Sequence, residues 1–270
     1  MKVKNQTIQA LRKLQRTLAE RIVLKDGFFS LKRIAAFDLA FFDNEAVVVG
    51  VITDFKTCEL IELKSLKVKL FFPYIPTLLA FREAPPIIRV FKKFKSKPDL
   101  TLINGHGLAH PNLCGIASHI GVVLDVSTIG IAQNKLCGHY EEPRKVGEAK
   151  RLIFDGRTVG FVLKSRENCR PIFISPGHKV SLKTSLEIVK KLIKDHKLPE
   201  PLYLAHSLAN KIKMSMLKNN SMPSVWKNIK CPACGKPNDR EELKARNGVC
   251  IHCGFKIVSN LSLFVNNKKK

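Results

Sequence analysis

Hydrophobic and polar positions in the first quarter of the chain predict one helix followed by strands. Leucine and isoleucine recur every three or four residues over 6–24, with arginine and lysine between them, the pattern of an amphipathic helix. From Ile34 the pattern changes to runs of β-branched and aromatic residues, interrupted at Asp43-Asn44 and at Asp54. These runs predict a meander of three strands, at 34–42, 46–53 and 60–72.

Helix-like and strand-like segments alternate after residue 76. Helical periodicity is present through Leu79 and over 86–94 and 112–123, while apolar runs at 100–103 and 127–132 predict buried strands. Because strands that alternate with helices usually pair in parallel, this order indicates an α/β core of two or three layers.

Further short strands and two helices complete the main domain. Apolar runs predict strands at 152–154, 158–163 and 172–174, with a hairpin turn at Asp155-Gly156. Helices are expected at 182–193 and 200–213. The sequence thus predicts a domain over 1–213, a linker over 214–230, a small module over 231–258 and a basic tail over 259–270.

Four cysteines define the small module. Cys231 and Cys234 form one Cys-x-x-Cys pair, Cys250 and Cys253 form the second, and each pair is followed by glycine. Four thiolates at this spacing can close a tetrahedron around Zn²⁺, and so short a module needs a metal to fold. We expect a structural zinc ribbon, with His252 outside the ligand set; a pair of redox dithiols is the alternative.

Charge narrows the choice of partner. The 270 residues carry 47 Lys and Arg against 22 Asp and Glu, a formal net charge of +25 that favours a polyanion, nucleic acid first. With 45% hydrophobic residues the chain can bury a core, which excludes disorder throughout. Neither a membrane span nor a signal sequence is visible, so we expect a cytoplasmic protein that does not bind membranes.

Three polar residues of the main domain are candidates for chemistry. Asp38 lies within an apolar strand, where a carboxylate is costly to bury unless it is paired or binds a cation. Glu83 opens a helix, where it can serve the site or only the helix start. His178 follows a Pro-Gly turn, and a site role, a capping role and a core role all remain open. Asp38, Asn104 and His178 all fall at or near predicted strand ends, where α/β sheets place their sites.

The segment Phe72-Pro73-Tyr74-Ile75-Pro76 predicts a stiff projecting loop. Two prolines frame an aromatic and a branched residue. Such a tip can enter a base stack as an apolar wedge. A rigid turn with Tyr74 folded into the core is the alternative.

A series of motifs in order over residues 6–213 resembles the endonuclease V family. The motifs are Phe72-Pro-Tyr-Ile-Pro76, Leu79-Ala-Phe-Arg-Glu83, Gly105-His-Gly-Leu-Ala-His110-Pro, Gly115-Ile-Ala-Ser-His119, Thr128-Ile-Gly-Ile-Ala132, Ser175-Pro-Gly-His178 and Leu204-Ala-His-Ser-Leu-Ala-Asn210. The resemblance implies a ribonuclease H-like mixed sheet flanked by helices. It also implies Mg²⁺-dependent cleavage of a phosphodiester one nucleotide 3′ of a deaminated base, hypoxanthine in DNA or inosine in RNA.

The resemblance also implies roles for individual residues. Asp38 would be the first metal-binding carboxylate, Glu83 the second acid and His178 the site histidine. Asn104 would offer a carbonyl oxygen to Mg²⁺ or Mn²⁺. The substrate would meet Gly105, Gln133 and the wedge, which is formed by Pro73, Tyr74, Ile75 and Pro76 with Tyr74 at its tip.

Two positions depart from the family. Asn104 stands where the family has an Asp, and Gln133 stands where it has a Lys. The first change removes an anion from the metal site, and the second removes a cation expected near the scissile phosphate. A replacement from Lys135, Asp99 or Asp125 is an alternative.

Three functional classes therefore remain. The chain is an endonuclease V-like enzyme, a catalytically silent nucleic-acid-binding protein, or a scaffold whose zinc module recruits a protein partner. Nucleic acid is a partner in the first two classes, and cleavage separates them.

Overall fold

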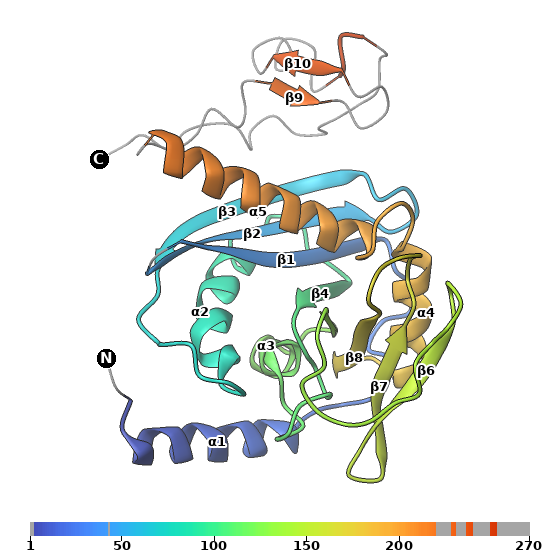
Figure 1. Ribbon diagram of the computed structural model, residues 1–270. Coiled ribbons are helices and arrows are strands. Elements are labelled where there is room, and N and C mark those ends of the chain that lie inside the picture. The colour runs from blue at the N-terminus through green and yellow to red at the C-terminus, as the bar shows by residue number, and fades with distance from the viewer. Residues whose placement is uncertain (1–2, 43, 220–227, 231–235, 240–248, 253–270) are drawn as a thin grey trace.

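A mixed sheet flanked by helices forms the body of the protein (Figure 1). The computed structural model describes residues 3–42, 44–219, 228–230, 236–239 and 249–252. The helices are α1 (Asn5–Ala19), α2 (Leu79–Phe91), α3 (Ile116–Leu124), α4 (Leu182–Leu192) and α5 (Glu200–Asn219). The strands of the main sheet are β1 (Arg33–Phe42), β2 (Glu45–Asp54), β3 (Leu60–Lys69), β4 (Leu100–Asn104), β5 (Thr128–Ala132), β6 (Ala149–Phe154), β7 (Arg157–Leu163) and β8 (Ile172–His178).

The direction of the strands fixes which residues share an edge of the sheet. The eight strands lie in the order β3-β2-β1-β4-β5-β8-β7-β6. The central strands β1, β4 and β5 are parallel, whereas β2, β3, β8, β7 and β6 join through antiparallel pairs. The carboxyl ends of β1, β4 and β5 therefore meet at one edge, and β8 runs the opposite way.

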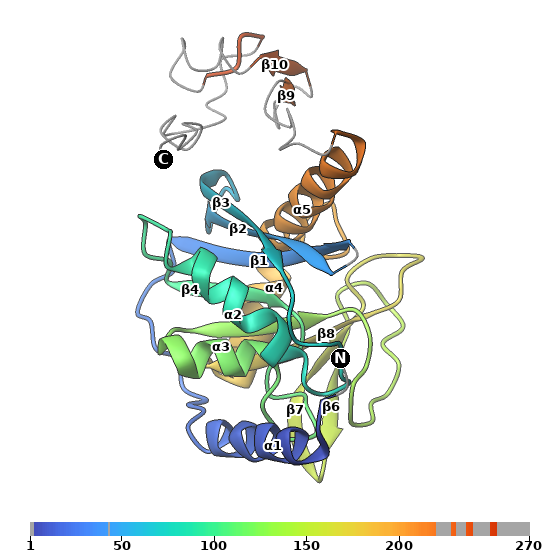
Figure 2. The ribbon, with the colours of Figure 1, turned by 90° about the vertical axis from the view of Figure 1, so that its left-hand side faces the viewer.

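Alternation along the strands builds a core on both faces of the sheet. In β1, Ile34 and Ala36 pack in one cluster with α4 and α5, while Ala35 and Phe37 pack in another with α2 and α3. Figure 2 shows α5 above the sheet and α2 and α3 below it. This arrangement follows from the two-residue period of strand side chains.

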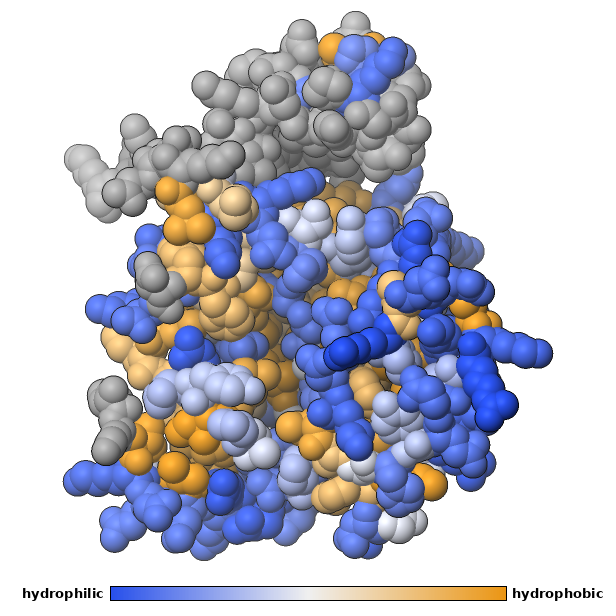
Figure 3. All heavy atoms as spheres, in the orientation of Figure 1, coloured by the Kyte–Doolittle hydropathy of each residue, from blue (hydrophilic) through white to orange (hydrophobic). Residues whose placement is uncertain are grey.

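Helix α1 packs against α3 through one buried apolar side chain. Leu18 joins Cys114 and Val122 in a small apolar cluster. The other side of α1 carries the basic residues of the predicted amphipathic pattern. In Figure 3, hydrophilic side chains predominate on the right of the face drawn, and hydrophobic side chains gather on its left.

Much of the predicted order is confirmed, but several bounds differ. Helix α1 ends at Ala19, five residues before the predicted end at 24. The α/β class and the three-stranded meander are present as expected. Helix α2 continues through Pro85 and Pro86, because its buried residues pack against the sheet and offset the lost backbone hydrogen bonds. Strand β8 includes the predicted Pro-Gly turn and ends only at His178. Helix α5 extends to Asn219, six residues beyond the predicted end at 213.

Little of the predicted zinc module belongs to the described residues. Cys231, Cys234 and Cys253 lie outside them, and a two-stranded sheet pairs β9 (Asn228–Lys230) with β10 (Pro237–Asp239). Cys250 is buried, and its Sγ accepts a hydrogen bond from the backbone N–H of His252 at 3.4 Å. None of the helices among the described residues is both long and apolar enough to cross a membrane.

Candidate active site

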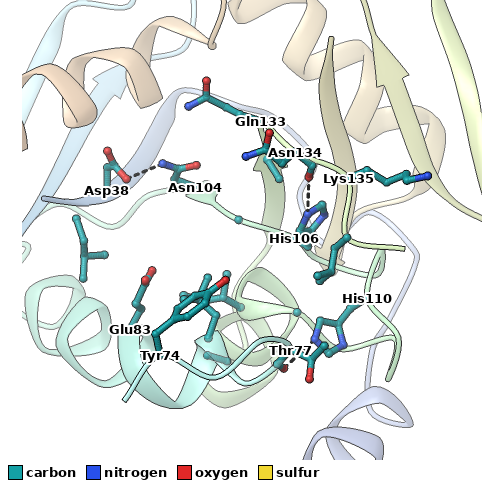
Figure 4. Close-up of a pocket in the computed structure, with 18 of the residues that line it drawn as sticks. Asp38, Tyr74, Thr77, Glu83, Asn104, His106, His110, Gln133, Asn134 and Lys135 are labelled. Carbon is teal, nitrogen blue, oxygen red and sulfur yellow. Dashed lines mark hydrogen bonds between the residues drawn. The ribbon is translucent and has the colours of Figure 1, made fainter. Parts of the chain in front are cut away.

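A pocket of about 470 Å³ lies at the carboxyl ends of β1, β4 and β5 (Figure 4). In open α/β sheets, ligands bind at this edge. Helix α2 and the loop before it also contribute lining residues. The predicted site residues in its wall are Asp38, Tyr74, Glu83, Asn104, Gly105 and Gln133.

Strand register brings Asp38 and Asn104 together. Phe37 of β1 pairs with Ile103 of β4, and the two polar residues come one position later on these parallel strands. Asn104 Nδ2 donates a hydrogen bond to Asp38 Oδ1 at 2.7 Å. Asp38 is only 4% exposed, so this amide supplies part of the solvation that the carboxylate lost on burial. The carboxamide therefore contacts Asp38 directly, through its N–H group.

His206 of helix α5 satisfies the second oxygen of Asp38. Asp38 lies on the face of β1 that packs against α5, and His206 Nδ1 is 2.6 Å from its Oδ2. The hydrogen bond to Asp38 raises the pKa of His206, although partial burial opposes the shift. The Asn210 amide lies 3.1 Å from the other ring nitrogen. Asp38 thus has one hydrogen-bond donor on each oxygen.

Glu83 faces the same pocket from α2. Burial raises the pKa of its carboxyl group to about 8, and the nearby Asp38 carboxylate adds to the rise. At neutral pH the carboxyl group is therefore largely protonated. It is 7% exposed, and Figure 4 shows it pointing toward Asp38 and Asn104.

No lysine or arginine occupies the position of Gln133, where the resemblance implies a cation near the scissile phosphate. Gln133 follows β5 directly and lines the pocket without a charge. Lys135 extends away from Asp38, and its Nζ lies 5.9 Å from the centroid of the Tyr140 ring (Figure 4). Lys197, from the turn between α4 and α5, donates to Gln133 Oε1 at 3.4 Å.

The predicted wedge loop projects beside the pocket. Tyr74 is 68% exposed and lines the pocket, so it is not folded into the core. Pro73, Ile75 and Pro76 belong to the same loop but do not line the pocket. Arg82 of α2 donates to the carbonyl oxygen of Phe72 at 2.6 Å, which ties the start of the loop to the helix.

Two side chains from distant parts of the chain hold the end of this loop. Thr77 has a φ of +71°, a conformation that non-glycine residues rarely adopt. Its carbonyl oxygen accepts hydrogen bonds from Gln15 Nε2 at 2.8 Å and from His110 Nε2 at 2.9 Å. Gln15 is fully buried and also accepts from the Asn112 amide at 3.0 Å. Helix α1 is therefore part of the support of the loop.

His178 does not lie at this site, which corrects its assignment as the site histidine. Strand β8 is antiparallel to β5, and His178 pairs with Thr128, the first residue of β5. The histidine therefore sits at the opposite edge of the sheet from Gln133. Its Nδ1 accepts from the Val23 N–H at 3.2 Å, its Nε2 lies 3.3 Å from Asp125 Oδ1, and burial lowers its pKa.

The histidine that contacts Asp38 is His206, which the sequence analysis did not single out as a site residue. His206 is the third residue of Leu204-Ala-His-Ser-Leu-Ala-Asn210. Helical spacing puts His206 beside Ala205 and Ala209, which are buried against the sheet. This spacing was the only indication in the sequence that His206 faces inward. The proposed replacements Asp99 and Asp125 do not line the pocket; Asp99 accepts from the N–H groups of Lys32 and Arg33.

A divalent cation fits this donor set poorly. Both oxygens of Asp38 already accept hydrogen bonds, and Asn104 turns its N–H group toward that carboxylate. Burial and the nearby Asp38 carboxylate raise the pKa of Glu83, so a cation would have to displace its proton. Within the described residues, no three His, Cys, Asp or Glu side chains gather as a metal-binding group. Mg²⁺ prefers several charged oxygen ligands, and this pocket offers one carboxylate that is already hydrogen-bonded.

Fold and pocket together define an α/β protein with an acidic site at the carboxyl ends of parallel strands. A family profile described as Endonuclease V matches residues 16–207, so the chain belongs to the endonuclease V family. The endonuclease V of Dictyoglomus turgidum is 44% identical over 195 residues, which are 72% of this chain and 86% of that protein. That of Thermosipho melanesiensis is 41% identical over 201 residues, 74% of this chain and 88% of that protein.

Solved structures of the family share the fold. The Bacillus subtilis endonuclease V superposes with a TM-score of 0.75 at 32% identity, covering 81% of this chain and 95% of that one. Endonuclease V of Ciona intestinalis superposes with a TM-score of 0.65 at 26% identity, covering 81% of this chain and all of that one. The Ciona structure is a complex with a 23-mer DNA that contains an inosine followed by a ribo-adenosine.

Proposed function

We propose that this protein binds nucleic acid and recognises a deaminated base, hypoxanthine or inosine, in the pocket beside Tyr74. The family membership, the inosine-containing DNA bound by the Ciona relative and the net charge of +25 support the choice of partner. A cavity of about 470 Å³ falls in the range of ligand sites, and the exposed Tyr74 next to it suits a base-separating wedge.

We further propose that strand cleavage by this chain is much slower than the family's Mg²⁺-dependent reaction one nucleotide 3′ of the lesion. One observation carries this proposal, the 2.7 Å hydrogen bond from Asn104 Nδ2 to Asp38. The Asn104 amide occupies the position where an aspartate would repel Asp38 and attract a cation. To bind Mg²⁺ or Mn²⁺ with Asp38 and Glu83, the Asn104 amide would have to give up this hydrogen bond and turn its oxygen toward the ion, so binding would be weak.

The test uses inosine-containing and undamaged oligonucleotides, both as DNA and as RNA. Each is supplied single-stranded and as a duplex, with Mg²⁺ or Mn²⁺. Wild type, Asp38→Ala and Asn104→Asp are assayed for binding and for cleavage. We expect wild type to bind the inosine strand more tightly but to cut it slowly or not at all, and Asn104→Asp to cut at least tenfold faster.

Two outcomes would overturn these proposals separately. Equal affinity for inosine and undamaged strands would remove the recognition of a deaminated base. Cleavage by wild type as fast as by Asn104→Asp, and abolished in Asp38→Ala, would make the chain a fully active nuclease.

For the small module we propose that Cys231, Cys234, Cys250 and Cys253 bind a structural Zn²⁺. The spacing of the two Cys-x-x-Cys pairs supports this, as does the N–H···S hydrogen bond at Cys250. The module would then offer a second contact to nucleic acid or to a protein partner. Metal analysis of freshly purified protein should find one zinc per chain, which a chelator releases; a preparation without zinc would end this proposal.

A further inference from the structure

Among the described residues, no lysine or arginine of the pocket wall faces its acids. Asp38 and Glu83 both line it. Lys135 is the only lysine or arginine among the described residues of its wall, and its ammonium group lies over the Tyr140 ring. A phosphodiester that entered the pocket would therefore find no ammonium or guanidinium group of the wall directed at it, so such a contact has to come from outside the wall.

Lys197 reaches the pocket from outside its wall. It is half-buried in the turn between α4 and α5, and its Nζ lies 3.4 Å from Gln133 Oε1. Gln133 itself lines the pocket, next to Asp38 and Asn104 in Figure 4. The contact therefore places the Lys197 ammonium group next to the neutral Gln133 side chain, which lines the pocket.

The turn that carries Lys197 is anchored on both sides. Before it, His196 Nδ1 lies 2.9 Å from the Glu200 carboxylate, and its ring stacks on Tyr203 with a centroid separation of 3.4 Å. After it, Leu198 is buried in the core. Because the backbone on either side is held, the direction of the lysine side chain is restricted, which lowers the entropy lost when it binds.

We propose that Lys197 is a phosphate-binding residue, which holds a backbone phosphate of the nucleic acid at Gln133. The ammonium group has three donors, and Gln133 Oε1 occupies one of them, so two remain for phosphate oxygens. Gln133 then acts as a positioning residue for this cation. The inference rests on the proposed function only in assuming that a strand enters this pocket.

The direct test measures binding of single-stranded oligonucleotides by fluorescence anisotropy across a range of salt concentrations. The variants are Lys197→Gln, Lys197→Arg and, as a matched control, Lys190→Gln, which removes an exposed charge from α4. Lys197→Gln should weaken binding to inosine and undamaged strands by about fivefold to tenfold, and should reduce the slope of log Kd against log salt by about 0.7. Lys197→Arg should retain most of the affinity, and Lys190→Gln should change the slope much less.

A double variant separates phosphate binding from a merely structural role. Gln133→Lys restores a cation at the same place from β5, so Gln133→Lys with Lys197→Gln should recover the affinity and the salt slope. If Lys197 only held the α4–α5 turn, the added lysine would restore neither. Melting temperatures of all variants establish that each one is folded.

Failure of this inference is distinguishable from failure of the proposed function. An unchanged affinity and slope in Lys197→Gln would overturn the phosphate contact, whatever the preference for inosine. Loss of the inosine preference in wild type, with the slope still reduced in Lys197→Gln, would overturn recognition of the base and leave the phosphate contact standing.

Discussion

At the scale of single residues, the Asn104 amide nitrogen provides one of the two hydrogen bonds that Asp38 accepts. Asn104 and aspartate have nearly the same shape, but the amide donates a hydrogen bond to Asp38 where a carboxylate would repel it. With His206 on the other oxygen, the Asp38 charge is compensated within the chain. Both oxygens of Asp38 are therefore hydrogen-bonded to side chains of the same chain.

Asn104→Asp should make the fold depend on divalent cations. Two buried carboxylates in contact should lower the free energy of unfolding by about 2 kcal/mol without metal. Mg²⁺ should restore much of this loss, while wild type should show little response to Mg²⁺ or to a chelator. Thermal unfolding with and without Mg²⁺ measures the difference. Asn134→Asp, the same change at an exposed pocket residue, is the control, and an equal Mg²⁺ response there would contradict the argument.

At the scale of elements, the wedge loop depends on parts of the chain that are far away in sequence. Arg82 of α2 holds its start, and the strained Thr77 at its end accepts hydrogen bonds from α1 and from the segment after β4. The loop is thus fixed at both ends while Tyr74 at its tip stays exposed. Such support reduces the ordering that binding requires.

Tyr74→Ala should reduce the preference for inosine strands several-fold. The tip supplies a stacking surface, whereas bulk affinity comes from phosphate contacts, so binding to undamaged strands should change little. Competition between labelled inosine and undamaged oligonucleotides measures the ratio. An equal loss on both strands would assign the loop a structural role.

Gln15→Leu should act on the same loop from α1. The variant leaves the Asn112 amide and the Cys114 carbonyl without their buried partner, so the free energy of unfolding should fall by about 1–3 kcal/mol. Inosine preference should fall as well, because Thr77 keeps only the hydrogen bond from His110. Gln9→Leu, at an exposed position of the same helix, is the control for the added apolar side chain. Full stability in Gln15→Leu would contradict this account of the support.

At the scale of the whole molecule, buried neutral histidines couple the stability of the fold to pH. Burial lowers the pKa of His110 and of His119 from 6.5 to about 4. His110 donates through Nε2 to Thr77 and accepts at Nδ1 from the Asn112 N–H, which suits only the neutral ring. His119 packs edge-on against Phe81, and its buried Nδ1 has no hydrogen-bond partner among the described residues.

The contribution of these histidines to stability should therefore be lost as the pH falls from about 6.5 to 4, while Glu83, whose pKa burial raises to about 8, contributes in the opposite direction above about pH 4.5. In that window the histidines bind protons in the unfolded chain but not in the folded chain, so unfolding becomes more favourable, and the effect saturates below pH 4. A shift of this size corresponds to about 3 kcal/mol for each histidine. Urea unfolding at a series of pH values measures the slope. His119→Phe keeps the aromatic contact and should flatten the dependence; an unchanged slope would contradict the assignment.

Some features of the site were predictable from the sequence because their causes are local. An acid in an apolar strand marked Asp38, and two prolines marked the Tyr74 loop as exposed and stiff. His178 was misplaced, because the sequence did not indicate that β8 runs antiparallel to β5. His206 and Lys197 were missed, since their positions depend on how α5 and the turn before it lie across the sheet.

The amino-acid sequence by itself determined the order of helices and strands, the family and the two departures at Asn104 and Gln133, because periodicity and residue type are properties of neighbouring positions. Only the tertiary structure decided which histidine reaches Asp38, that the Asn104 amide faces that carboxylate, and that Lys197 approaches Gln133. The direction and register of paired strands, and the helix laid across them, are set by contacts between residues up to 168 positions apart.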